Sequence, residues 1–146
     1  MCRAAMRWAD EDDELGHRTA VQLTPDRVRE ADLVITATVA ERGAVALLDP
    51  LARTKTFTLL EAIDLAEDDV TGPEYARPGD QTLAALLHSR RGRVQTGTRR
   101  RWRGGIDIAD GHNAGPIRHF LTLRVTSAAA RHLADRLGSL VDQLAV

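Results

Sequence analysis

The chain has 146 residues, of which 43% are hydrophobic and 28% are charged, a composition that fits one globular domain and excludes disorder throughout. Residues 1–73 carry 15 acidic and 8 basic side chains (net −7), whereas residues 74–146 carry 6 and 12 (net +6), so the two halves are expected to attract each other. Because the chain lacks an uncharged apolar run of about 18 residues and starts unlike a signal peptide, we expect a cytoplasmic protein without a membrane partner.

The N-terminal part is predicted to be an acidic arm followed by a helix. Residues 1–16 contain five consecutive acids at 10–14, whose mutual repulsion favours a poorly ordered segment. Thr24 then provides a helix N-cap, and Pro25 suits the first helical position. An acidic residue such as Asp26 is favoured there by the positive end of the helix dipole. We therefore expect a short helix that ends near Ala31.

Two strands are predicted next, each followed by a helix. Residues 32–38 place three large apolar side chains side by side, which is typical of a parallel strand covered on both faces. A helix is predicted at 40–48, with Asp49 and Pro50 ending it. Residues 54–59 alternate and are rich in β-branched side chains, so they form the second strand, before a helix at 60–67. This order predicts an α/β fold with two parallel strands.

The remaining chain is predicted to contain a loop, a helix, a basic loop and a long helix. Glycines and prolines mark a loop over 68–80, after which Asp80 is expected to cap a helix that ends near Arg90. A basic loop spans about 91–115, and Pro116 opens the long helix. One face of that helix is expected to pack in the core, or to be exposed if the core is incomplete; it carries Ala129, Leu133, Leu137, Leu140 and Leu144.

Three ordered segments carry a resemblance to a known family. They are His-Arg-Thr-Ala-Val-Gln-Leu-Thr-Pro-Asp at 17–26, Ala-Asp-Leu-Val-Ile-Thr-Ala-Thr at 31–38 and Arg-Thr-Lys-Thr-Phe-Thr-Leu-Leu-Glu at 53–61. Together they resemble actinobacterial low-molecular-weight protein-tyrosine phosphatases. The resemblance implies a phosphatase-like domain at 17–146 with a partial three-layer α/β fold, in which helices flank a small parallel sheet. The first strand and the phosphate loop of that fold are missing here, through truncation or degeneration.

The resemblance also implies an activity and its residues. The family hydrolyses phosphotyrosine or a related phosphomonoester through a phosphocysteine intermediate, and an aspartic acid protonates the leaving oxygen. Asp110 matches that general acid and Asp107 is its first acidic neighbour. Gly111 stands where the family has proline, and His112 stands where an aromatic side chain walls the substrate. His112 is therefore either a binding residue that stacks on an aryl group or a solvent-facing loop residue.

The family signature, a cysteine followed by five residues and an arginine, has no match. The only cysteine is Cys2, and Trp8 falls where the arginine would be. A short likeness of residues 2–6 to the end of the phosphate loop would make Arg3 a binding residue and leave no nucleophile. We expect an inactive protein without a cofactor. The five histidines are scattered without metal-ligand spacing, so we expect no metal site.

Two alternatives to a phosphatase remain, together with one further expectation. The first alternative is a non-catalytic interaction or regulatory protein on the same scaffold, which binds phosphorylated or acidic ligands through the basic loop. The second, which we favour less, is nucleic-acid binding, because seven arginines at 90–103 surround Trp102. Finally, because two strands alone bury little, we expect a protein that is either marginally stable or self-associated through the edge of the strand at Leu33–Ile35 and the face of Leu133, Leu137 and Leu140.

Overall fold

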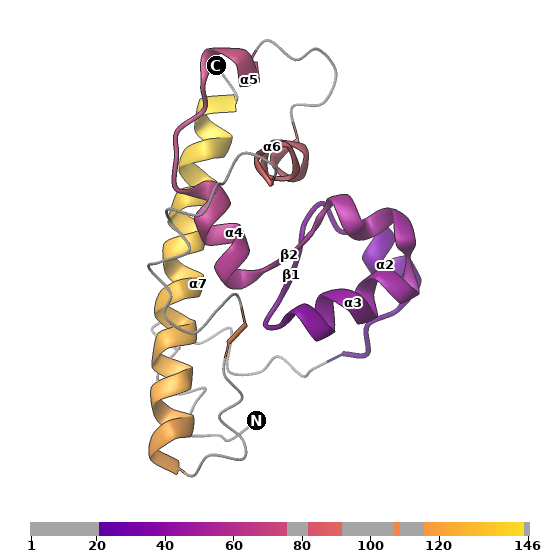
Figure 1. Ribbon diagram of the computed structural model, residues 1–146, viewed down its shortest axis with the longest axis vertical. Coiled ribbons are helices and arrows are strands. Elements are labelled where there is room, and N and C mark those ends of the chain that lie inside the picture. Colours follow the sequence, from indigo (N-terminus) through magenta and orange to yellow (C-terminus); the bar gives the residue numbers. More distant parts are fainter. Residues whose placement is uncertain (1–20, 76–81, 92–106, 109–115, 145–146) are drawn as a thin grey trace.

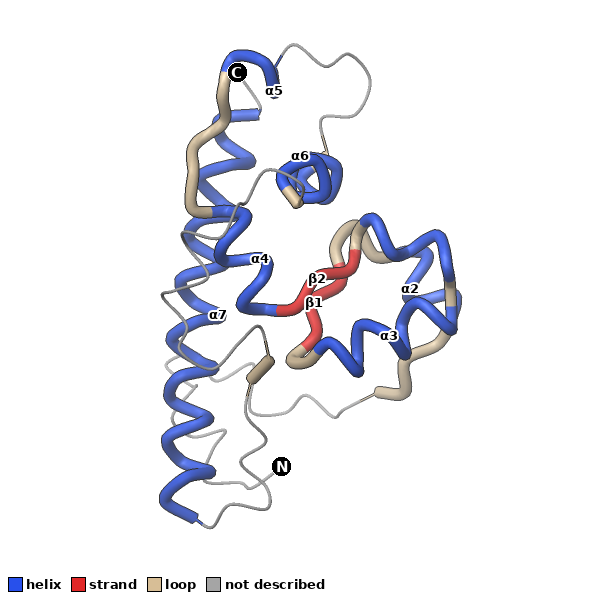
Figure 2. The backbone as a smooth tube through the Cα atoms, viewed as in Figure 1, coloured by secondary structure: helices blue, strands red, loops and turns tan. Residues whose placement is uncertain are grey.

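A small parallel sheet lies between two groups of helices in a computed structural model of the chain, which describes residues 21–75, 82–91, 107–108 and 116–144. Strands β1 (Val34–Thr36) and β2 (Thr56–Thr58) pair in parallel, with Ile35 opposite Phe57. Figures 1 and 2 show the strands between α2 and α3 on one side and α4, α6 and α7 on the other. The described part is therefore mixed α/β and mostly helical, with a two-stranded parallel sheet.

The helices α2 (Pro25–Glu30) and α3 (Val39–Leu48) and the 3₁₀ helix η2 (Pro50–Thr54) form the first group. The predicted N-cap of α2 is confirmed, because the Thr24 hydroxyl accepts a hydrogen bond from the Arg27 N–H at 3.4 Å. Val28, Val45 and Ala52 form a small buried cluster, against which Val34 of β1 packs. The even-numbered side chains of β1 thus face this group.

The helices α4 (Leu59–Ala66), α5 (Gly72–Tyr75), α6 (Leu83–Arg90) and α7 (Pro116–Leu144) form the second group. Phe57 is fully buried in the larger core, which contains the apolar side chains of α4 together with Leu86 and Leu87 of α6. Leu133 and Leu140 of α7 complete this core at 4% and 0% exposure. The predicted core face of α7 is confirmed. The prediction that Leu133 and Leu140 take part in self-association is wrong, because both side chains are buried in this core.

The strands differ from their predictions in length and in cover. Each has three residues, because Thr38 and Thr58 start α3 and α4 directly after the sheet. Ile35 keeps 38% of its surface exposed, so the prediction that β1 is covered on both faces is wrong. Phe57 on the neighbouring strand draws α4 and α6 over β2, and this cover stops short of Ile35.

Two local predictions need correction, and one is confirmed with an addition. The N-cap of α6 is Thr82, whose hydroxyl accepts from the Ala85 N–H at 3.2 Å, and Asp80 lies outside the described residues. The predicted end of α3 is confirmed, because Asp49 is its extended C-cap; the Asp49 carboxylate then accepts from the Leu51 N–H at 3.0 Å and starts η2, which was not predicted. The predicted loop after α4 contains α5. Within the described ranges, no helix is both long and apolar enough to cross a membrane.

Two arginines hold the end of α4 against its neighbours. Arg90 of α6 is 5% exposed and donates to the carbonyls of Leu65, Asp68 and Asp69 at 2.8–3.0 Å. The same guanidinium makes two parallel 3.0 Å hydrogen bonds to the Glu74 carboxylate, a bidentate buried ion pair. Arg136 of α7 donates to the carbonyls at 66 and 67 at 3.0 and 2.7 Å. Both guanidiniums therefore satisfy carbonyls that the helix end leaves without intrahelical partners.

Candidate functional site

The carboxyl edge of the sheet is the place where parallel α/β sheets bind ligands. The described segment Asp107–Ile108 docks at this edge. The Ile108 N–H donates to the Ala37 carbonyl at 3.0 Å, and the Asp107 carboxylate accepts from the Val39 N–H at 2.7 Å. Two hydrogen bonds thus fix the start of the predicted acid loop just beyond β1.

A second carboxylate, that of Glu41, caps the start of α3. The Thr38 hydroxyl accepts from the Glu41 N–H at 3.1 Å, and Glu41 Oε2 accepts from the Thr38 N–H at 3.2 Å, which is a reciprocal capping box. The same oxygen accepts from the Ala37 N–H at 2.7 Å. Glu41 and Asp107 together therefore occupy three successive backbone donors after β1.

The start of α4 repeats the arrangement with Thr58 and Glu61. Thr58 is fully buried, its hydroxyl accepts from the Glu61 N–H at 3.2 Å, and Glu61 accepts from the Thr58 N–H at 3.3 Å. Arg42 of α3 and Arg91 after α6 also bind the Glu61 carboxylate, at 2.7 and 3.0 Å. Burial acts to raise the pKa of Glu61, but the Arg91 hydrogen bond, the charges of Arg91 and Arg42 and the Thr58 N–H outweigh it and lower that pKa.

Arg91 also covers the outer edge of β2. Its guanidinium donates to the Thr56 carbonyl and, at 2.8 Å, to the Arg53 carbonyl, and it lies 4.1 Å from the centre of the Phe57 ring. Arg90 and Arg91 were predicted to belong to a basic cluster, yet Arg90 is buried on Glu74 and Arg91 is bound to Glu61. These two arginines stabilise the fold, and the rest of the cluster lies outside the described residues.

The electrostatic balance of the carboxyl edge does not favour an anion. Three carboxylates, from Glu41, Glu61 and Asp107, meet the guanidiniums of Arg42 and Arg91. A phosphate cradle needs open backbone N–H groups and an excess of positive charge. Among the described residues, the N–H groups at 37, 38, 39 and 58 already donate to these carboxylates.

The predicted site residues are brought to this edge only in part. Asp107 lies there with an exposed side chain that caps α3, whereas Asp110, His112, Arg3 and Cys2 lie outside the described residues. In the described part of the chain, no group of three or more His, Cys, Asp or Glu side chains could hold a metal ion. Sequence reasoning missed Glu41, Glu61 and their arginines, although each glutamate follows a threonine by three residues, which is a readable capping signal.

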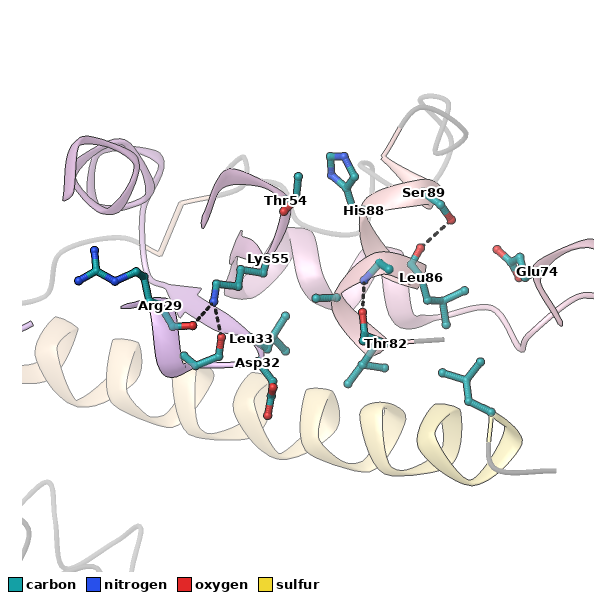
Figure 3. A pocket seen from close by; sticks show the side chains of 15 residues that line it. Arg29, Asp32, Leu33, Thr54, Lys55, Glu74, Thr82, Leu86, His88 and Ser89 are labelled. Atoms are coloured by element: carbon teal, nitrogen blue, oxygen red, sulfur yellow. Dashed lines mark hydrogen bonds between the residues drawn. The ribbon is translucent and has the colours of Figure 1, made fainter. Parts of the chain in front are cut away.

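A cavity of about 870 Å³ lies at the opposite edge of the sheet, where the strands begin (Figure 3). Leu33, Leu83 and Leu86 form part of its apolar wall, and Arg29, Lys55 and His88 also line it. The Lys55 ammonium donates to the carbonyls of residues 29 and 31 at 2.8 and 2.7 Å, so it caps α2. The cavity therefore lies at the other end of the strands from Asp107 and Ile108.

Comparisons with known proteins found no matching family model, no matching curated protein and no matching solved structure.

Proposed function

We propose that the chain is a low-molecular-weight protein-tyrosine phosphatase-like protein that does not hydrolyse phosphomonoesters. The proposal depends on one observation: two hydrogen bonds hold Asp107 and Ile108 just beyond β1, at the carboxyl edge of two parallel strands. A family acid loop must reach this edge to protonate a leaving group. The pinned segment belongs to the stretch 107–112, which resembles that loop in sequence.

The proposed roles follow from this placement. Asp110, three residues after the anchored Asp107, is the general acid of the ancestral reaction, and Asp107 positions its loop on α3. His112 and Arg3 are the proposed binding residues for an aryl group and for a phosphoryl oxygen. The absence of turnover follows from the chemistry, since attack on phosphorus needs a thiolate stabilised by a Cys-x5-Arg loop, and the sequence has none.

The non-catalytic alternative keeps the same scaffold. It is favoured by the carboxylates of Glu41, Glu61 and Asp107, which occupy backbone N–H groups at this edge and leave none of these to a phosphate. On this alternative the protein is an interaction or regulatory module. The ligand of such a module is a phosphorylated or acidic group held by the arginines of the 91–115 segment, other than the engaged Arg91.

The direct test is hydrolysis of para-nitrophenyl phosphate by the purified chain. We expect no release above the buffer rate, and we expect Cys2→Ser to change nothing. Turnover that Cys2→Ser abolishes would make Cys2 the nucleophile and overturn the proposal. An Asp64→Asn variant, prepared in the same way, is the matched control: it should behave as the wild type does, so that a loss of activity confined to Cys2→Ser is assigned to the thiol.

A gain-of-function chimera tests the resemblance itself. Residues 1–16 are replaced by the strand, Cys-x5-Arg loop, helix and second strand of a low-molecular-weight phosphatase. The chimera should hydrolyse the substrate, and Asp110→Asn should reduce kcat by about 10²–10⁴-fold, as expected for loss of a general acid. A chimera that folds cooperatively but has no activity, or one in which Asp110→Asn has no effect, would refute the assignment.

Self-association is proposed through the outer edge of β1. The Val34 N–H donates to the Lys55 carbonyl at 2.9 Å, so the ladder alternates and the N–H and C=O of Ile35 point away from β2. Among the described residues, this edge receives one backbone bond, from Ile108 to Ala37. An open edge beside an exposed Ile35 is a template for pairing with another chain.

A further inference from the structure

The N-terminal half of α7 carries a set of large apolar side chains that the core does not use. Ile117, Leu121 and Val125 are 77%, 53% and 55% exposed, and we name them the α7 ridge; Phe120, at 39% exposure, lies beside it. In the same half of the helix, Thr122 and Thr126 continue the line of Ala129 and Leu133 and are half-buried. Two threonines therefore occupy the body-facing line of α7 here, while the three ridge residues stay exposed.

The spacing of the ridge defines the shape of a partner. Ile117, Leu121 and Val125 are four residues apart, which forms one of the ridges that interdigitate when two helices pack at about −50°. Figure 1 shows this orange half of α7 extending past the end of α4. Contiguous exposed apolar surface of this kind marks an interaction site.

The charge around the ridge defines the chemistry of the partner. Residues 111–134 contain no Asp or Glu, whereas Arg124 and Arg131 are exposed and follow one flank of the ridge. The Arg124 guanidinium lies 5.9 Å from the centre of the Phe120 ring, so its charge stays beside the apolar side chains. A partner that places carboxylates along this flank would be attracted, and one that places cations there would be repelled.

Two other occupants fit these observations less well. A second copy would bring Arg124 of one chain towards Arg124 of the other, with no acidic residue of the 111–134 stretch to compensate. On a helix with 3.6 residues per turn, Arg124 and Arg131 point away from the body-facing line, whereas Val125 lies at its side, about 70° from that line. A flat membrane would therefore meet the arginines first and miss Val125.

We propose that the α7 ridge is the docking site for an acidic amphipathic helix of a protein partner. The partner presents its own ridge of apolar residues spaced four apart, flanked by Asp or Glu that pair with Arg124 and Arg131. This docking surface is independent of the phosphatase-like assignment, because it uses no residue of the sheet edge or of the acid loop.

The test uses the full chain and two labelled helical peptides. One peptide combines leucine at every fourth position with alanine and flanking glutamates, and the other has lysine in place of every glutamate. In fluorescence anisotropy, the acidic peptide should bind at least about tenfold more tightly, a difference of about 1.4 kcal/mol, and salt should reduce the difference. Leu121→Asp should weaken this binding at least about tenfold.

Matched variants and competing probes make the result decisive. Val141→Asp, at a 49% exposed position on the same helix, should leave the affinity unchanged, and Arg124→Glu should reverse the preference between the peptides. Circular dichroism checks that each variant is folded. Equal affinity for both peptides would overturn the proposal. So would dimerisation in sedimentation, or binding to phosphatidylserine vesicles without peptide binding, where either depends on Leu121.

Discussion

The buried pair of Glu74 and Arg90 gives the sharpest prediction about stability. We expect Glu74→Gln to destabilise the fold, because it removes the charge from a carboxylate 8% exposed and leaves the Arg90 guanidinium buried opposite an amide. The hydrogen bonds from Arg90 lower the pKa of Glu74 from 4.5 to about 2, against the effect of burial, and Thr71 contributes in the same direction.

The size of the effect follows from that pKa. A carboxylate whose pKa falls from 4.5 to about 2 on folding contributes about 3 kcal/mol to the free energy of unfolding at neutral pH. Breaking a buried ion pair by removing one partner costs about 3–5 kcal/mol. We expect Glu74→Gln to lower the free energy of unfolding by about 3 kcal/mol, near the lower limit of this range, because Arg90 keeps its three carbonyl acceptors.

Urea unfolding at several pH values measures both the free energy lost in Glu74→Gln and the pH dependence of the Glu74 contribution. Because the folded pKa of Glu74 is depressed, its contribution is complete above about pH 4.5 and is lost as the pH falls towards about 2. The wild type should lose this stability over that range, and Glu74→Gln should lack that part of the pH dependence. The control is Glu30→Gln at an exposed position. Equal unfolding midpoints for the two variants at neutral pH would refute the reasoning.

Four further predictions follow from the same contacts. Asp107→Ala should cost about 1 kcal/mol in urea unfolding, since it removes an N-terminal acceptor of α3. Leu140→Ala, at a fully buried position, should cost about 2–5 kcal/mol in the same assay. Arg91→Met should raise the pKa of Glu61, measured by NMR titration of the side-chain carboxyl carbon, because its strongest hydrogen-bond donor is lost. Ile35→Lys should abolish concentration-dependent association in sedimentation velocity, if the outer edge of β1 pairs two chains.

The helices could be predicted from sequence because their signals are local. The Thr24–Pro25 start of α2, the Pro116 start of α7 and the leucines of its core face each depend on neighbouring residues alone. The limits of the strands could not be predicted in this way. Apolar side chains at 33–35 suggested a strand covered on both faces, but the cover over Ile35 depends on where α4 and α6 pack, which is a tertiary property.

The candidate site was predictable only in part. The sequence singled out Asp107 as a site residue but did not place it in the fold, and the structure has it just beyond β1. Its role as the cap of α3 could not be inferred, because Val39 is 68 residues away in the chain. The ion pairs of Glu61 with Arg42 and Arg91 join three different elements and leave no short-range pattern beyond the capping box.

The carboxyl edge of this sheet is satisfied by the chain's own carboxylates. In a phosphate-binding site, backbone N–H groups at a helix start are held ready for an anion, and their desolvation is offset only when it binds. Here Glu41, Asp107 and Glu61 supply those acceptors permanently, and Arg42 and Arg91 balance much of their charge. The described part of the fold therefore needs no bound anion at this edge. A phosphate entering there would have to displace carboxylates that α3 and α4 require for their starts. The same contacts that stabilise the edge thus oppose its use as a phosphate site.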